Sequence, residues 1–368
     1  MAVSKSKETK KEPAKTNRRK PVTKATGPAV EGHTPGDLID QLSKPSKNRM
    51  SMFDMMRAQS HHVCDGFMKH FDENVRLPVP INERRRVKIE KDEEYVSAQY
   101  AKMEQSEYIM IQAPTKTNYR LLWKIIQQDQ VKIMVCLCHD DQMSASDDAS
   151  KCFQYFPTEP NQSMEVEQKK GKLTILCKTR EGLSMGAVKY EFELTDSEAV
   201  EEKNTDDPNA TGSKALQITM FHMNTWTGTR PETGNALEQA QNVALFMREV
   251  NKAEISVLRK SIENFVPPVA IQSFDAIGRA GIAWAILMLL KDVEKRECFD
   301  MPDLIKKLMK LRPGCISSYF HFAFCMAVSL HIGKEMKWCE NDCTNALKDL
   351  EAKFGDRKLN EVGNLAVN

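Results

Sequence analysis

One short segment, PPVAIQSFDAIGRAGIAW at residues 267–284, constrains the fold more than any other part of the chain. It reads as an apolar run, a tight loop with a Gly-x-x-Gly pattern, and a second apolar run of helical length. A strand that enters a helix through such a loop directs backbone N–H groups toward one point, where the helix N-terminus adds partial positive charge. Arg279 stands at the expected start of the helix, where its planar guanidinium can bind two phosphate oxygens. The pattern is typical of an anion-binding loop, yet the chain places an acidic residue, Asp275, inside it.

The rest of the chain mixes strand and helix patterns. Apolar alternation predicts strands at residues 84–89, 94–101, 108–114, 131–138, 172–179, 187–194, 215–224 and 266–271. Helical spacing predicts helices at 119–130, 234–254, 281–293, 301–313 and 317–332. Because many strands are adjacent in sequence while others alternate with helices, we expect an α/β (α+β) domain with a central mixed, twisted sheet flanked by helices. The polar stretch at 195–214 is expected to be a long exposed loop.

Composition narrows the class of protein. The chain of 368 residues is 41% hydrophobic and 28% charged, which is normal for a protein with a sizeable core. No apolar run reaches the roughly 18 to 20 residues needed to span a bilayer, and the N-terminus lacks the apolar centre of a secretory signal. The ten cysteines follow no regular framework, which favours thiols in a reducing compartment. We therefore expect a cytoplasmic protein without a transmembrane segment, with the nucleus as the alternative.

The net charge of +2 conceals a basic N-terminus. Residues 1–50 contain twelve Lys and Arg against five Asp and Glu, so this part carries +7 and the remainder −5. With few apolar residues to bury, residues 1–50 are expected to form a basic, disordered leader. The cluster NRRKP at 17–21 is compatible with a nuclear localisation signal or with contact to an anionic surface, such as nucleic acid or membrane. A leader that only solubilises the chain is the alternative.

Several other motifs flank the loop: YVSAQY at 95–100, YIMIQAP at 108–114 followed by Trp123, KCFQYFP at 151–157, Trp226, and LRPG at 311–314. Together with the loop, and in this order, they make residues 52–333 resemble the catalytic domain of protein tyrosine phosphatases. The loop of that family, His-Cys-Ser-Ala-Gly-x-Gly-Arg-Thr-Gly, falls on residues 272–281, and its six-residue step from nucleophile to arginine is kept. The resemblance implies a phosphatase-like domain at 52–335 and a short C-terminal extension at 336–368. It also implies a phosphate-binding loop formed by Ser273, Phe274, Asp275, Ala276, Ile277, Gly278 and Arg279.

The main departures from the family pattern replace residues that take part in catalysis. Ser273 replaces the cysteine nucleophile, whose thiolate such a loop stabilises, whereas a serine hydroxyl needs an adjacent base. Gln272 replaces the preceding histidine and supplies no base. The acid loop begins at Trp226 and continues through Gly228 without the aspartate that protonates the leaving phenolate, a loss of commonly ~10²–10⁴-fold in rate. The resemblance therefore implies vestigial positions rather than catalytic residues at Ser273, Trp226 and Gly228.

Other family positions are also replaced. The two glutamines that position water fall on Ser317 and His321, neither of which is a simple substitute. The tyrosine that stacks on the substrate ring falls on Arg76, a candidate for substrate recognition. With nucleophile, acid and water-positioning groups all changed, catalysis by the family's route is not expected.

Asp275 leaves two interpretations of the loop open. Two unit charges about 6 Å apart repel by about 3 kcal/mol at an effective dielectric near 20, so the carboxylate opposes a bound phosphate. An outward side chain would weaken this effect, whereas Asp275 could instead pair with Arg76 or turn inward and occupy Arg279. Ala276 stands where the family has glycine, which puts the curvature of the loop in question. The loop either retains phosphate binding or persists as a degenerate pocket.

Clusters of cysteine and histidine elsewhere are expected to be structural. The sequence CLCH at 136–139 ends a buried strand, and CENDC at 339–343 lacks a second ligand pair with zinc-like spacing. Cys315 aligns with a buried methionine of the family, so packing is expected there rather than a surrogate nucleophile. His61 and His62 lie in an amphipathic stretch and are expected to be ordinary helix residues. We expect no metal and no cofactor.

The favoured function is that of a pseudophosphatase, a catalytically inactive tyrosine-phosphatase-like protein that binds a phosphorylated protein or a protein kinase in signalling. An active or weakly active phosphatase that hydrolyses phosphotyrosine is the first alternative. A scaffold that uses residues 1–50 on nucleic acid or an anionic membrane is the second.

Overall fold

Strand β10 (Val269–Ser273) lies at the centre of the main sheet, between two parallel neighbours. In this computed structural model it pairs with β2 (Ser106–Gln112) on one side and with β3 (Ile133–Cys136) on the other. All three strands point the same way, so their carboxyl ends meet at one edge of the sheet. The loop predicted to bind an anion leaves β10 at this edge.

The structure describes residues 69, 81–89, 94–103, 106–146, 148, 150–169, 171–197, 215–227, 236–261, 265–294, 300–312, 314–316, 318–337 and 340–354. All of them belong to one unit of the chain, Gly32–Asn368. The expected leader, Arg76, Ser317, Gly228, His61, His62 and most of the expected loop at 195–214 lie outside the described residues.

The main sheet has eight strands in the order β1-β2-β10-β3-β9-β8-β7-β6. Its centre is parallel, because β3 also pairs in parallel with β9, while the pairs at both ends are antiparallel. A separate sheet joins two short parallel strands, β4 (Met143–Ser144) and β5 (Cys152–Phe153). The remaining strands of the main sheet are β1 (Ala98–Met103), β6 (Ser163–Glu167), β7 (Lys172–Leu183), β8 (Ala187–Asp196) and β9 (Leu216–His222).

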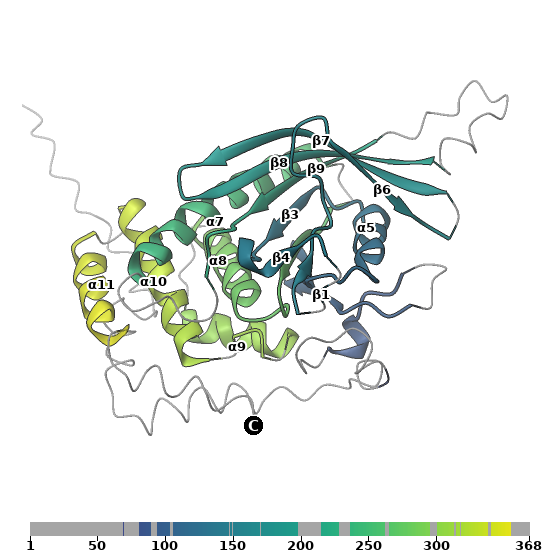
Figure 1. Cartoon of the computed structure of the whole chain (residues 1–368). Coiled ribbons are helices and arrows are strands. Elements are labelled where there is room, and N and C mark those ends of the chain that lie inside the picture. Colours follow the sequence, from purple (N-terminus) through teal and green to yellow (C-terminus); the bar gives the residue numbers. More distant parts are fainter. Residues whose placement is uncertain are drawn as a thin grey trace, which may run out of the picture. The chain divides into compact units, whose positions relative to one another are not determined.

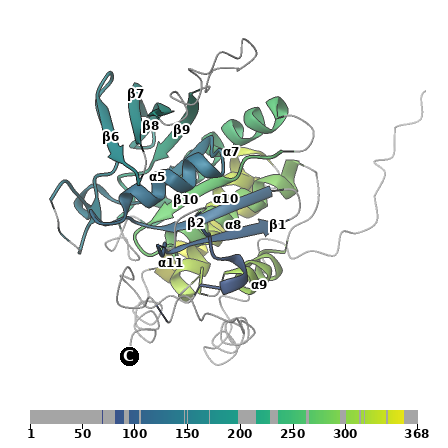
Figure 2. The ribbon, with the colours of Figure 1, turned by 90° about the vertical axis from the view of Figure 1, so that its right-hand side faces the viewer.

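Helices cover both faces of the sheet (Figures 1 and 2). Helix α5 (Tyr119–Gln128) packs on one face, and α7 (Ala236–Lys260), α8 (Arg279–Glu294) and α10 (Tyr319–Glu335) pack on the other. Helix α9 (Met301–Leu311) follows α8, and α11 (Glu340–Phe354) packs against α10 and α7. The fold is therefore the mixed-sheet α/β architecture that the sequence predicts.

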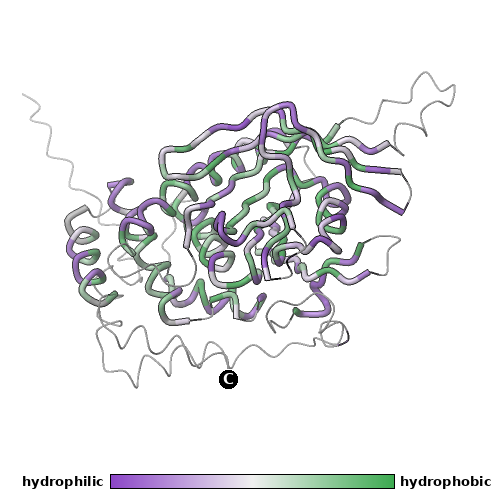
Figure 3. Tube along the Cα trace, viewed as in Figure 1, coloured by the Kyte–Doolittle hydropathy of each residue, from purple (hydrophilic) through white to green (hydrophobic). Residues whose placement is uncertain are grey.

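Alternation along the central strands divides the interior into two cores. In β2, Tyr108 and Met110 face the core formed with α7, α8 and α10, whereas Ile109 and Ile111 face the core formed with α5. The same alternation holds in β3 and β10, as expected for strands covered on both faces. Helix α8 is buried around its whole circumference from Ala280 to Leu290, and Figure 3 shows its apolar character.

A buried ion pair joins the helices behind the sheet. The Lys291 ammonium of α8 contacts the Glu254 carboxylate of α7, and it also donates a 2.5 Å hydrogen bond to Ser106 Oγ at the start of β2. The same ammonium lies 5.0 Å from the centroid of the Tyr108 ring. These contacts tie α7 and α8 to β2 at the end of the sheet opposite the loop.

The strand predicted at residues 84–89 is wrong in its first half. Residues Glu83–Arg85 form a single turn of 3₁₀-helix, η1, and only an isolated bridge from Arg86 to Gln99 reaches the sheet. Asn82 starts the turn by accepting a 3.0 Å hydrogen bond from the Arg84 amide. These local bonds satisfy the backbone of the turn, so it does not pair with β1. Strands β4, β5 and β6 were not predicted, because each is short and shows little apolar alternation.

Candidate functional site

The candidate site is the loop between β10 and α8. Ser273, the last residue of β10, is fully buried, and its carbonyl accepts a 2.8 Å hydrogen bond from the Ala113 amide after β2. The Gln272 carbonyl accepts a 2.8 Å bond from the Leu137 amide after β3. The two neighbouring strands therefore hold both sides of β10 up to the residue where the loop begins.

The backbone of the loop keeps a tight curve. Ala276 has φ of 57° and Gly278 has φ of 56°, both in the left-handed region. Ala276 therefore adopts a conformation that costs a residue with a Cβ roughly 1–2 kcal/mol, and the replaced glycine does not prevent the turn. At Gly278 an added Cβ would lie only 2.8 Å from Cε1 of His321, so the imidazole occupies the space that the glycine leaves. The Gly278 amide donates a 2.9 Å bond to the Cys315 carbonyl, which ties the loop to the segment before α10.

Asp275 turns its carboxylate into the loop. Its Oδ1 atom accepts a 3.1 Å hydrogen bond from the Ile277 amide and lies 3.4 Å from the Ser273 hydroxyl oxygen. Burial raises the pKa of this carboxyl, while the Ile277 amide and the Arg279 guanidinium oppose part of the rise. The loop thus contains an anionic group of its own, bound to one of the amides that would hold a ligand.

Arg279 is the first residue of α8, and its guanidinium is already engaged. Its Nη1 atom donates to the Trp226 carbonyl at 2.9 Å, and Nη2 donates to Gln142 Oε1 at 2.6 Å. Only 6% of the residue is exposed. Asp275 therefore turns inward, but its hydrogen-bond partner is the Ile277 amide and not Arg279. The Arg279 guanidinium instead donates to two neutral oxygen atoms.

Gln142 is a site residue that the sequence analysis missed. It ends the 3₁₀ turn η2 (Asp140–Gln142), and its Oε1 atom also accepts a 3.1 Å bond from the His139 amide. The signal was present, because the polar run HDDQ at 139–142 follows a buried strand that is parallel to β10. Polar residues after neighbouring parallel strands meet at the same edge of a sheet.

Among the described residues, Ser273 Oγ makes only long contacts. Its hydroxyl oxygen lies 3.4 Å from Asp275 Oδ1 and 3.4 Å from the Ile277 carbonyl, both at the long limit of a hydrogen bond. A carboxylate is a weak base for an alcohol, and its charge would also repel an approaching phosphate. The Gln272 side chain points elsewhere, because it accepts a 3.3 Å bond from the Tyr155 hydroxyl and donates to sulfur atoms. That Gln272 supplies no base stays a prediction.

Trp226 and His321, the described residues at the acid-loop and glutamine-loop positions, are packed as core. Trp226 is buried and stacks on Phe324 of α10, with ring centroids 5.5 Å apart. His321 is buried on α10, and its amide donates to the capping Ser318 Oγ at 3.1 Å. Burial, with the Arg279 charge as the second cause, lowers the pKa of His321 to about 4, so the imidazole is neutral at pH 7. Neither side chain is placed as an acid.

Three cysteine thiols lie beside Gln272. Its Nε2 atom donates to Cys138 Sγ at 3.2 Å and to Cys152 Sγ at 3.8 Å, and Cys136 precedes them at the end of β3. Hydrogen bonds from the Cys136 and Cys152 thiols lower the pKa of Cys138, with the Arg279 charge as a weaker cause, whereas burial raises the pKa of Cys136. Cys315 is also buried, which raises the pKa of its thiol to about 12 and does not suit a nucleophile.

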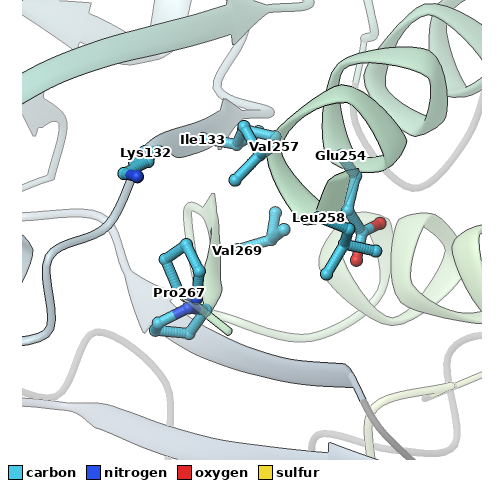
Figure 4. Close-up of a pocket in the computed structure, with 8 residues that line it drawn as sticks. Lys132, Ile133, Glu254, Val257, Leu258, Pro267 and Val269 are labelled. Carbon is cyan, nitrogen blue, oxygen red and sulfur yellow. The ribbon is translucent and has the colours of Figure 1, made fainter. Parts of the chain in front are cut away.

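A hollow lies at the end of β10 opposite the loop (Figure 4). Its apolar lining comes from α7, from β3 and from residues 267–269 at the start of β10, and Lys132 and Glu254 are the charged members. The Glu254 carboxylate is held by Lys291. Within the described residues there is no group of three or more His, Cys, Asp or Glu side chains arranged for a metal ion. None of the described helices has the length and apolarity to cross a membrane.

Comparison with known proteins identifies the class. The protein-tyrosine phosphatase family model matches residues 70–331, and the chain belongs to this family. Among curated proteins, it is 20% identical over 251 residues to tyrosine-protein phosphatase non-receptor type 20 of Mus musculus, covering 67% of this chain and 50% of that protein. It is 25% identical over 242 residues to receptor-type tyrosine-protein phosphatase C of Homo sapiens, covering 64% of this chain and 16% of that protein. The chain thus spans half or less of the length of these relatives.

Proposed function

We propose that this chain is a pseudophosphatase, a non-catalytic member of its family that binds a phosphorylated protein or a protein kinase in signalling. The observation that supports the proposal best is the Asp275 carboxylate inside the loop, 3.1 Å from the Ile277 amide and 3.4 Å from Ser273 Oγ. A phosphotyrosine that entered the loop would meet a serine, a like charge and an engaged arginine. By the family's route, a serine hydroxyl without a base does not attack phosphorus, and none of these groups protonates the leaving phenolate.

The same geometry favours a partner that binds beside the loop rather than deep within it. A phosphate at the bottom of the loop has to displace Asp275 from the Ile277 amide. It also has to take Arg279 from the Trp226 carbonyl and Gln142. Loss of these bonds offsets part of the favourable charge interaction. The loop residues Ser273, Phe274, Asp275, Ala276, Ile277, Gly278 and Arg279 then serve mainly to shape the surface that the partner contacts.

The experiment is a hydrolysis and binding assay on the full chain. The wild type and Ser273→Cys are incubated with a phosphotyrosine peptide, with an active member of the family as positive control. We expect no turnover above buffer from either protein, because restoring one group of a concerted set recovers little activity. Robust hydrolysis by wild type of demonstrated purity would establish the alternative, an active phosphatase. Hydrolysis by Ser273→Cys alone would show that only the nucleophile is missing.

Binding is measured separately from turnover. Calorimetry with a phosphotyrosine peptide and its unphosphorylated form tests whether a partner's phosphate contributes to affinity. Equal affinity for both forms supports contact beside the loop. A preference for the phosphorylated form that Asp275→Ala strengthens supports contact within it. We also propose a cytoplasmic location, with the nucleus as the alternative, because the ten cysteines follow no regular framework. The role of residues 1–50 on an anionic surface stays a prediction.

A further inference from the structure

The hollow at the end of β10 opposite the loop adjoins an exposed apolar segment. Phe265 and Val266 are 51% and 38% exposed, and with Met336 they are the large apolar residues most open to solvent in the described part of the chain. Pro267 and Pro268 follow them directly and line the hollow. A contiguous apolar surface of this kind marks a contact site, whereas apolar residues exposed singly are ordinary.

The size of the hollow suits an anchoring side chain. Its open space is about 200 Å³, whereas pockets for drug-sized ligands take roughly 300–1,000 Å³. Its walls are rigid, because β2 and β3 hold β10 on both sides from Val269 onward and proline fixes the backbone at 267 and 268. A rigid surface loses little conformational entropy on binding, so one or two side chains of a partner can occupy it productively.

Pro267 and Pro268 also limit how a partner can bind. Proline has no backbone N–H group, so this end of β10 cannot donate hydrogen bonds to an added strand. Recognition by strand addition depends on such bonds. Contact at the hollow therefore has to be made by side chains.

Three cations lie beside the apolar residues. Lys132 lines the hollow, and Arg259 and Lys260 directly follow the lining residue Leu258. Lys260 is also three residues after Val257, which makes the two neighbours on the surface of α7. None of the three cations forms an ion pair with another described residue.

The charge of this face contrasts with that of the rest of the domain. The chain carries +2 and residues 1–50 carry +7, so residues 51–368 carry −5. Glu254, the acidic residue of the lining, is paired with Lys291. Arg259 and Lys260 lie in the last turn of α7, where cations favour the helix dipole, but Lys132 lies outside any helix and the dipole does not account for it. The face is therefore apolar and locally positive.

We propose that this face binds a protein segment that places an apolar anchor in the hollow and acidic side chains beside Lys132 and Lys260. An anchor in a small pocket supplies much of the affinity of such contacts, and opposite charge around it fixes the orientation. A membrane fits less well, because a hollow receives a side chain whereas insertion into lipid needs apolar side chains that project. The face lies at the opposite end of β10 from the loop, so this binding does not depend on the proposed function.

The test is a selection of peptides on the full chain. A random peptide library displayed on phage is selected against the immobilised wild type, and synthetic copies of the enriched peptides are measured by calorimetry. We expect a consensus of one large apolar residue flanked by Asp or Glu, with an affinity that falls as salt rises. Changing the apolar residue to Ala, or the acids to their amides, should weaken binding about fivefold or more.

Two substitutions in the chain identify the face. Phe265→Ser and Lys132→Glu should each lower the affinity for the enriched peptides about fivefold or more. Met336→Ser and Lys310→Glu are the matched controls, because both residues are exposed and neither lines the hollow, and they should bind as the wild type does. Circular dichroism verifies that each variant is folded.

Three outcomes would overturn the proposal. The first is that no acidic and apolar consensus is enriched, or that the enriched peptides bind Phe265→Ser and Lys132→Glu as tightly as the wild type. The second is cosedimentation with phosphatidylcholine vesicles containing phosphatidylserine that Phe265→Ser removes, since the face would then be a lipid contact. The third is a dimer in analytical ultracentrifugation that Phe265→Ser dissociates, since a second copy of the chain would then be the occupant.

Discussion

The Oδ1 atom of Asp275 lies 3.1 Å from the backbone nitrogen of Ile277, inside a loop whose shape otherwise suits an external anion. A loop of this kind binds phosphate because several amides and one arginine converge on empty space. Here one amide holds a carboxylate of the same loop, and Arg279 donates to Trp226 and Gln142. The Ile277 amide and the Arg279 guanidinium, two groups that could bind an external anion, are therefore already bonded to atoms of the same chain.

Removing the carboxylate should make the loop available to an external anion. We expect Asp275→Ala to tighten binding of a phosphotyrosine peptide by ~1–3 kcal/mol, roughly 5- to 150-fold, because a like charge and a competing acceptor both disappear. Isothermal titration calorimetry measures the change. Asp275→Asn is the matched control, since it removes the charge but keeps an oxygen that can accept from Ile277, and it should give a smaller gain. Equal affinities for all three proteins would place the ligand outside the loop.

The raised pKa of Asp275 predicts how stability depends on pH. A carboxyl with a raised pKa in the folded state favours folding most below its unfolded value of about 3.9, and this contribution is lost as pH rises through the folded pKa. Asp275→Asn should therefore be more stable than the wild type at pH 7, and the difference should shrink as pH falls toward 4. Urea unfolding at several pH values measures it. A difference that stays constant with pH would mean that Asp275 titrates normally.

His321 should have the opposite effect on acid stability. Its pKa of about 4 in the folded protein lies below the unfolded value of about 6.5, so stability is present above pH 6.5 and is lost as pH falls toward 4. Between pH 7 and pH 5 this group should cost the wild type about 2 kcal/mol. His321→Gln should reduce the loss between those pH values, whatever its effect on packing at pH 7. His222 and His331 also have lowered pKa values, so part of the stability loss at low pH should remain in the variant. A pH dependence identical to that of the wild type would contradict this role for His321.

Gly281 should be intolerant of any side chain. A Cβ at this position of α8 would lie 2.0 Å from the backbone carbonyl oxygen of Cys315, and backbone cannot yield as a flexible side chain can. We expect Gly281→Ala to lower the free energy of unfolding by about 3 kcal/mol or more. Gly182→Ala is the control, because an added Cβ there meets no atom within 4 Å. Chemical denaturation of both variants measures the contrast, and a neutral Gly281→Ala would contradict the close approach of α8 to residue 315.

The fold could be predicted because its central elements carry strong local signals. The apolar runs at 131–138 and 266–271 and the helix at 281–293 are confirmed as β3, β10 and α8, because elements buried on both faces need continuous apolar residues. Strand β6 lacked such a signal, since only Val166 of its residues is buried. The turn η1 is held by polar contacts of Asn82 that apolar periodicity does not detect.

The chemistry of the candidate site could be predicted only in part. Ser273 and Gln272 are informative as residue types, because a hydroxyl and an amide lack the chemistry of a thiolate and an imidazole in any geometry. The direction of the Asp275 carboxylate depends on loop torsions that the residue types alone do not define. The contact between Gln142 and Arg279 joins positions 137 residues apart, and it arises from the parallel packing of β3 beside β10.

The engaged state of Arg279 bears on how such a protein evolves. Its guanidinium connects α8 to the segment after β9 and to the turn after β3, so the residue supports the fold whether or not any phosphate arrives. Under the proposed function, a lineage with this arrangement would keep the arginine for its structural contacts while the positions of the family's catalytic groups change. Under the same proposal, a return to catalysis would need a thiol at 273, an acid after Trp226, a neutral residue at 275 and a released arginine together, so we expect no single change to restore activity.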